Sequence, residues 1–242
     1  MNTETLDQPI VADVAVSAPA VVIESATPAV AAVAEGPNPF IALGLDGALV
    51  RAVSDLGYTQ PTEVQAKVIP LAMGSGKADE ASIDLMVSSQ TGSGKTAAFL
   101  LPVLNTLIAQ KAIEAAAEQA EFERQRAQAA ASGEAAPKRA KRKNPMQSRN
   151  FKAAVPGALV LCPTRELAQQ VAQDAIELVK HCKNLRVANV VGGMPYQLQI
   201  AKLQNADLVV ATPGRLLDLQ RSLQIKLDKV QFLVVDEADR ML

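Results

Sequence analysis

Short apolar runs alternate with helix-like stretches throughout the second half of this 242-residue chain. The apolar runs are rich in Leu, Val and Ala and lie at residues 158–161, 186–191, 206–211 and 230–235. The stretches with helical spacing lie between them, at residues 165–180, 195–203 and 214–221. Runs this short and continuous are typical of strands that are buried on both faces. The alternation therefore predicts an α/β fold, with a parallel sheet covered by helices on both faces.

The first half of the chain opens with two predicted helices. Helical spacing over residues 48–56 predicts the first, which Gly57 could terminate. Thr62 can cap the second, which should run to about residue 71.

A strand and a long helix are predicted next. A β-prone run at residues 83–87 predicts the strand, and an apolar run at residues 97–107 predicts the helix. The composition remains helix-forming over residues 109–131, but no clear apolar stripe continues, so this part is either an exposed helix or disordered. Residues 132–150 are rich in Ser, Gly, Pro, Lys and Arg and should form a flexible loop. We therefore interpret residues 110–150 as a helical and basic low-complexity insertion.

The beginning of the chain has a different composition. Residues 1–37 are rich in Ala and Val, contain several prolines and lack aromatic residues, which predicts a disordered tail. Order should begin near Phe40. Residues 38–242, interrupted by the insertion, then form one domain.

The charge of the chain is uneven, although the formal net charge is only −1. Residues 138–143 are almost all basic, whereas residues 1–39 hold five acids and no Lys or Arg. The basic cluster is either a solvated loop or an auxiliary patch that binds nucleic acid with salt-dependent affinity.

Several classes of site and location are disfavoured by the composition. The two cysteines form no disulfide framework and no zinc spacing, which favours a reducing, cytoplasmic location. The one histidine, His181, leaves little material for histidine-based catalysis and is interpreted as a polar residue near a helix end. We expect no membrane span, because charged residues and prolines interrupt the apolar stretches, and no signal peptide, because the start lacks a basic region.

The candidate chemistry centres on a loop between the predicted strand and the long helix. It consists of Ser89, Gln90, Thr91, Gly92, Ser93, Gly94, Lys95 and Thr96. Strand, glycine-containing loop, Gly-Lys-Thr and helix is the arrangement that binds nucleotide phosphates through backbone N–H groups and the positive end of the helix. Lys95 would reach the outer phosphates and the Thr96 hydroxyl would ligate Mg²⁺. The generic pattern has Gly where this chain has Ser89, and such loops also occur as simple flexible turns.

Other polar residues also follow the predicted strands. They are Pro163-Thr164-Arg165, Gly192-Gly193, Thr212-Pro213-Gly214-Arg215 and Asp236-Glu237. The carboxyl ends of parallel strands meet at one edge of a sheet, so these loops and the phosphate loop should form a single site.

The acidic pair at the last strand end provides a second anchor for the metal ion. Asp236 would hold Mg²⁺ through water, and Glu237 would orient and deprotonate an attacking water. The alternative is that both acids only cap the following helix. Together, Lys95, Thr96, Asp236 and Glu237 predict one magnesium–triphosphate pocket.

These motifs together resemble the DEAD-box RNA helicase family. Asp236-Glu237-Ala238-Asp239 matches the family signature, and residues 57–65 resemble its Q motif, with Phe40 as the upstream aromatic. Residues 89–96 resemble its motif I, in which Ala or Ser at the first position is usual. The remaining strand-end loops are similar to its three RNA-contacting motifs.

The resemblance implies a RecA-like domain with assigned contacts. Gln65 would hydrogen-bond adenine, so ATP is the expected nucleotide, and Tyr58 would stack on the base unless it is only a core aromatic. RNA phosphates and sugars would be held without sequence preference by Pro163, Thr164, Arg165, Gly193, Thr212, Gly214 and Arg215. The same residues can also serve as helix caps.

The resemblance also implies a second RecA-like domain that completes the ATP site, and the chain ends at Leu242, before such a domain. We expect ATP-dependent RNA helicase activity of the family, with nucleotide and RNA binding but little hydrolysis by this chain alone. The alternative is a catalytically silent nucleotide- or RNA-binding module. A DNA-directed phosphate-loop ATPase is disfavoured by the motif around Gln65.

Overall fold

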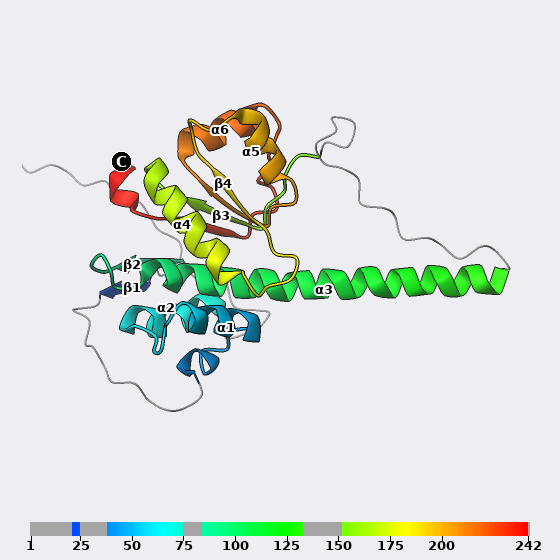
Figure 1. Cartoon of the computed structure of the whole chain (residues 1–242), viewed down its shortest axis with the longest axis horizontal. Helices are drawn as coiled ribbons and strands as arrows, with labels where there is room; N and C mark the ends of the chain where they lie inside the picture. The colour runs from blue at the N-terminus through cyan, green and yellow to red at the C-terminus, as the bar shows by residue number, and fades with distance from the viewer. Residues whose placement is uncertain (1–20, 25–37, 75–83, 133–151, 242) are drawn as a thin grey trace, which may run out of the picture.

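The carboxyl half of the chain forms a four-stranded parallel sheet with the order β4-β5-β3-β6. Figure 1 shows this half on one side of the long helix α3 (Lys95–Ser132). Its strands are β3 (Ala158–Leu161), β4 (Val187–Val190), β5 (Leu208–Ala211) and β6 (Phe232–Val235). In this computed structural model the described residues are 21–24, 38–74, 84–132 and 152–241. The predicted alternation of strands and helices is confirmed for this half.

Helices cover both faces of this sheet because side chains alternate along each strand. They are α4 (Arg165–Leu178), α5 (Tyr196–Leu203) and α6 (Pro213–Arg221). Val160 and Val210 point into the core that also contains the buried residues of α4, whereas Leu159 and Val209 point into the core beneath α5 and α6. Each βα unit is thus held by apolar packing, which leaves the strand ends free to carry polar loops.

Two capped helices begin the domain and pack on other helices, the first against α4 and the second against the long helix α3. They are α1 (Gly47–Asp55) and α2 (Glu63–Met73), preceded by a short 3₁₀ turn, η1 (Pro39–Ile41), in which Phe40 is buried. The Thr62 hydroxyl accepts a hydrogen bond from the Gln65 N–H, and the Gln65 side chain accepts one from the Thr62 N–H. This capping box confirms the predicted start of the helix. Gly57 follows α1 with a φ of 80°, which confirms the predicted stop.

Helix α3 (Lys95–Ser132) begins at the phosphate loop and continues unbroken into the region interpreted as an insertion. Its first half contributes Leu100, Leu101 and Leu104 to the core, and its second half extends away from the domain (Figure 1). Residues 110–132 are therefore helical, and residues 133–150 of the proposed insertion lie outside the described residues.

By length and composition, α3 is the one helix of the described residues that could cross a membrane. The most apolar part of this helix is 44% buried inside the domain. A single helix of this kind is weak evidence for a membrane span, because core helices reach the same length and hydropathy.

A second, two-stranded parallel sheet contains β1 (Val21–Glu24) and β2 (Leu85–Ser88), the strand that leads into the phosphate loop. The two strands pair in a register that places Val21 beside Leu85 and Glu24 beside Ser88. For these four residues the predicted disordered tail is wrong, because a β-branched Val-Val-Ile run can use the free edge of β2. Residues 1–20 and 25–37 lie outside the described part of the chain.

The last strand keeps one edge exposed. Within the described ranges β6 pairs only with β3, and the side chains of Leu233 and Val235 are 61% and 44% exposed. Unpaired apolar strand edges favour association with other chains.

Candidate functional site

The phosphate loop turns sharply between β2 and α3. Gly92 and Gly94 adopt φ values of 82° and 85°, which few residues other than glycine tolerate. The Lys95 ammonium donates to the carbonyl of Gln90 at 2.9 Å and also to that of Ser89. The cation therefore lies against the loop backbone, and the helix start contributes its positive end to the same place.

The side chain of Gln65 joins α2 to this loop. It is only 3% exposed, and its amide nitrogen donates to the Gly94 carbonyl at 3.2 Å. A Cβ at position 94 would lie 2.5 Å from that nitrogen, so the contact requires glycine there. The predicted hydrogen bond from Gln65 to adenine is not tested by this geometry and stays a prediction.

The acidic pair follows β6 at the same edge. The Asp236 N–H donates to the Leu161 carbonyl at 2.9 Å, which holds the residue beside the end of β3. Burial and then the charge of Glu237 raise the pKa of the Asp236 carboxyl, and both the Glu237 N–H and the Lys95 ammonium act in the opposite direction. Of these influences on the carboxyl, the charge of Lys95 is the weakest.

Glu237 is held in an unusual backbone conformation beside this carboxylate. Its φ is 50°, in the left-handed region, and its side chain pairs with Arg240 at 3.0 Å. Strained backbone of this kind is concentrated at functional sites.

The donor set fits a nucleotide-bound magnesium ion better than a metal held by protein alone. No group of three or more His, Cys, Asp or Glu residues in the described ranges could hold a metal. Magnesium is usually held by one or two protein groups together with phosphate oxygens and waters. Thr96, in the first turn of α3, and Asp236 are such groups, and their convergence on one ion stays a prediction.

The phenol of Tyr58 lies near two acidic residues of α4. Burial and the nearby carboxylates of Asp174 and Glu177 raise the pKa of its hydroxyl. The side chain is 40% exposed, so it is not a fully buried core aromatic. Stacking on adenine stays a prediction.

The loops after β3 and β5 meet in a shallow pocket of about 450 Å³. Its lining residues are Pro163, Thr164, Arg165, Glu166 and Thr212. The Thr164 hydroxyl caps α4 by accepting from the Leu167 N–H, whereas the Thr212 side chain makes no such bond at the start of α6. The capping role is thus confirmed for Thr164, and Thr212 keeps its hydroxyl for other partners.

The glycine pair after β4 lies directly beneath Arg165. A Cβ at Gly193 would lie 2.8 Å from Nη1 of Arg165, and one at Gly192 would lie 3.2 Å from Nη2. The Arg165 guanidinium therefore packs directly against the backbone of the two glycines. This contact places the loops after β3 and β4 side by side. Gly214 has no atom within 4 Å of its Cβ position and lies on open surface.

Arg215 is held by two residues that the sequence analysis did not identify. Its Nε donates to the Gln199 side chain at 2.8 Å, and its guanidinium lies 4.8 Å from the centre of the Tyr196 ring. Both partners belong to α5. One feature of the sequence could have identified Gln199. It lies four residues before Leu203, on the same face of α5, where an apolar residue is expected.

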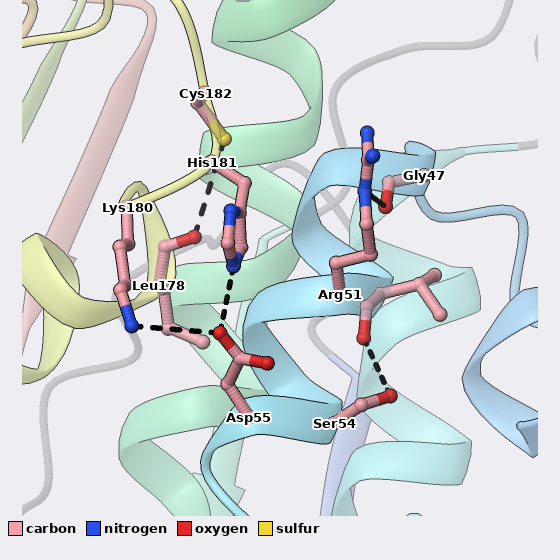
Figure 2. A network of polar contacts seen from close by, with 9 residues as sticks. Gly47, Arg51, Ser54, Asp55, Leu178, Lys180, His181 and Cys182 are labelled. Atoms are coloured by element: carbon pink, nitrogen blue, oxygen red, sulfur yellow. Dashed lines mark hydrogen bonds and ion pairs between the residues drawn. The ribbon is translucent and has the colours of Figure 1, made fainter.

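A separate polar network joins the end of α1 to the residues that follow α4 (Figure 2). His181 contacts the Asp55 carboxylate at 2.7 Å, and Lys180 lies 3.5 Å from it. The His181 contact lowers the pKa of Asp55 most. This network ties α1 to the end of α4, in agreement with the structural interpretation of His181.

Comparison with known proteins gives a consistent result. The sequence model of the DEAD/DEAH box helicase family matches residues 62–242. "DEAD-box ATP-dependent RNA helicase 52A" of Oryza sativa subsp. japonica is 41% identical over 204 residues, which cover 84% of this chain and 28% of that protein. "ATP-dependent RNA helicase DeaD" of Escherichia coli (strain K12) is 36% identical over 210 residues, which cover 86% of this chain and 26% of that protein. The chain thus spans less than a third of the length of these two relatives.

Solved structures have the same RecA-like fold. The helicase Prp28 from Chaetomium thermophilum, bound to ADP, matches with a TM-score of 0.57 and 32% identity over 82% of this chain and 38% of that one. Dbp5 of S. cerevisiae, bound to RNA and ADP BeF3, matches with a TM-score of 0.56 and 27% identity over 85% of this chain and 40% of that one.

Proposed function

The chain belongs to the DEAD/DEAH box helicase family, and on that premise we propose that it forms the ATP- and RNA-binding first domain of an ATP-dependent RNA helicase. The observation that carries the proposal is the placement of Lys95 against the phosphate loop at the start of α3, together with the placement of Asp236 after β6, where it bonds to the end of β3. Two charged groups of opposite sign, one at a helix start and one after a buried strand, suit a magnesium-bound triphosphate.

Nucleotide binding would replace contacts within the protein by contacts to phosphate. The Lys95 ammonium would exchange the carbonyls of Ser89 and Gln90 for phosphate oxygens, and the N–H groups at the start of α3 would bind the same phosphates. Thr96 and Asp236 would hold magnesium, which when bound neutralises charge on the phosphates. Glu237 would orient and deprotonate the attacking water.

RNA would bind along the loops after β3, β4 and β5. Arg165 and Arg215 supply charge, Thr164 and Thr212 supply hydroxyls, and Gly193 supplies exposed backbone. Contacts of these types are made to phosphate and sugar rather than to base edges, so the grip would be independent of sequence.

Hydrolysis would further depend on a second domain of the same type. The charge that develops on the transferred phosphoryl group must be neutralised from both sides of a closed cleft. We therefore expect full RNA-stimulated ATPase from a two-domain protein, stimulated by RNA in preference to DNA, and little turnover by residues 1–242 alone. Steady-state hydrolysis by this chain at two-domain rates would contradict that dependence.

Titration calorimetry with ADP and magnesium tests nucleotide binding by this chain. Lys95→Ala should weaken binding at least about tenfold, because it removes a charge-assisted contact to phosphate. Lys67→Ala is the matched control, since Lys67 pairs with Glu63 on the exposed side of α2. Equal affinity of Lys95→Ala and the parent chain would refute the proposed site.

A further inference from the structure

A buried glutamine connects two of the loops that are proposed to bind RNA. Gln199 has no exposed surface, although glutamine is among the residues that are seldom buried. Its amide nitrogen donates to the Val191 carbonyl, immediately before Gly192, and its amide oxygen accepts from the Arg215 Nε. The loops after β4 and β5 therefore share one side chain. The Thr212 N–H adds a second link by donating to the Val190 carbonyl at 3.2 Å.

The geometry of the amide determines where Arg215 can lie. A carbonyl such as that of Val191 accepts but cannot donate, so the amide must turn its NH₂ group toward it. The oxygen is then left facing Arg215, and reversal of the amide would leave both partners unpaired in a buried place. Because such a loss is costly, the orientation of the amide is fixed.

The ring of Tyr196 supports the guanidinium from a second direction. The distance of 4.8 Å from the guanidinium carbon to the ring centre is within the range of a cation–π contact. The remaining charged partner, Asp218, lies at 3.9 Å and is mostly exposed, so its contact is weak and a phosphate can replace it.

We propose that Gln199 and Tyr196 are positioning residues that hold Arg215 ready for an RNA phosphate and couple it to the loop of Gly192 and Gly193. This inference rests on the RNA-binding function proposed above. An arginine that is already ordered loses less conformational freedom when it binds, so its contribution to affinity is larger. Neither positioning residue needs to touch RNA.

The central experiment is a double-mutant cycle on the affinity of the 242-residue chain for a fluorescent single-stranded oligouridine, measured at several salt concentrations. Arg215→Ala should weaken binding and reduce the salt slope by about 0.7, the value for one lost phosphate contact on a single strand. Gln199→Leu should weaken binding about three- to tenfold, the cost of ordering one long side chain on binding. In the Arg215→Ala background, Gln199→Leu should have a markedly smaller effect, limited to what the loop of Gly192 and Gly193 contributes to binding.

Two further comparisons separate positioning from general damage. Gln204, at the end of α5, is also buried, so Gln204→Leu is the matched control and should leave RNA affinity unchanged. Tyr196→Leu should weaken binding, and Tyr196→Phe, which keeps the ring, should recover most of the loss. Gln199→Leu that weakens binding equally with and without Arg215 would overturn the inference, and so would no effect in either background.

Failure of the inference can be distinguished from failure of the proposed function. If the parent chain does not bind the oligouridine, the RNA-binding function is wrong. The position of Arg215 is tested without RNA by the NMR signal of its Nε–H, which should exchange slowly with water in the parent chain and rapidly in Gln199→Leu and Tyr196→Leu. An unchanged exchange rate in both folded variants would refute the positioning role.

Discussion

At the scale of single residues, the site combines groups that work against the stability of the fold. Asp236 lies half-buried beside Glu237, and both conditions disfavour its ionised form. Lys95 offsets part of this cost from the phosphate loop. Perturbed carboxyl groups of this kind are concentrated at functional sites, which supports the proposed contact of Asp236 with a cation.

Replacement of Asp236 should separate stability from function. Because its pKa is raised in the folded state, the ionised carboxylate destabilises the fold at neutral pH, and this penalty disappears as the pH falls and the group is protonated. Asp236→Asn should raise the midpoint of thermal unfolding at pH 7 and have less effect at pH 3. The same variant should lose magnesium-dependent ADP binding.

Asp218→Asn is a suitable control for the unfolding measurement, since Asp218 is an exposed acid whose contact to Arg215 is long. If Asp236→Asn instead lowered the midpoint of thermal unfolding at pH 7, relative to the parent chain, the ionised Asp236 carboxylate would not destabilise the fold.

At the scale of elements, the capping box at the start of α2 also connects this helix to the phosphate loop. Gln65 uses its oxygen to complete the capping box with Thr62 and its nitrogen to hold the Gly94 carbonyl. A change in the cap should therefore be transmitted to the loop. This arrangement gives Gln65 a structural role in addition to the predicted contact with adenine.

Thr62→Ala should lower the stability of the domain by about 1 kcal/mol, the usual cost of losing a side-chain cap. It should also weaken ADP binding, because Gln65 loses the residue that fixes its side chain. Thr62→Ser keeps the hydroxyl and should restore both properties. Chemical denaturation and calorimetry on the three proteins provide the test, and a stability loss without any change in ADP affinity would separate the cap from the loop.

At the scale of the whole molecule, the sequence was sufficient for the order and type of the elements and insufficient for contacts between distant segments. The run at 158–161 coincides with β3, and each predicted loop lies at a strand end, because local composition and periodicity carry that information. The pairing of Val21–Glu24 with β2 joins segments more than 60 residues apart. The bonds from Gln199 to Val191 and Arg215 likewise depend on packing that no local pattern reveals.

The exposed edge of β6 should govern the solution behaviour of the chain. Leu233→Lys should reduce concentration-dependent association, because charge on an edge strand opposes pairing with another chain. Its effect on stability should be small, since the side chain is 61% exposed. Ile176→Lys is the matched control, because Ile176 is a similarly exposed apolar residue on α4 rather than on a strand edge. Equal association of the Leu233 and Ile176 variants by light scattering would contradict the role of the strand edge.

The most direct test of the whole account is a crystal structure of this chain with magnesium and a non-hydrolysable ATP analogue. The account predicts that Lys95 leaves the Gln90 carbonyl for a phosphate oxygen and that the ion lies against the Thr96 hydroxyl, with the Asp236 carboxylate about 4–5 Å away through one water. A nucleotide bound elsewhere, or an ion beyond the reach of both Thr96 and Asp236, would contradict it.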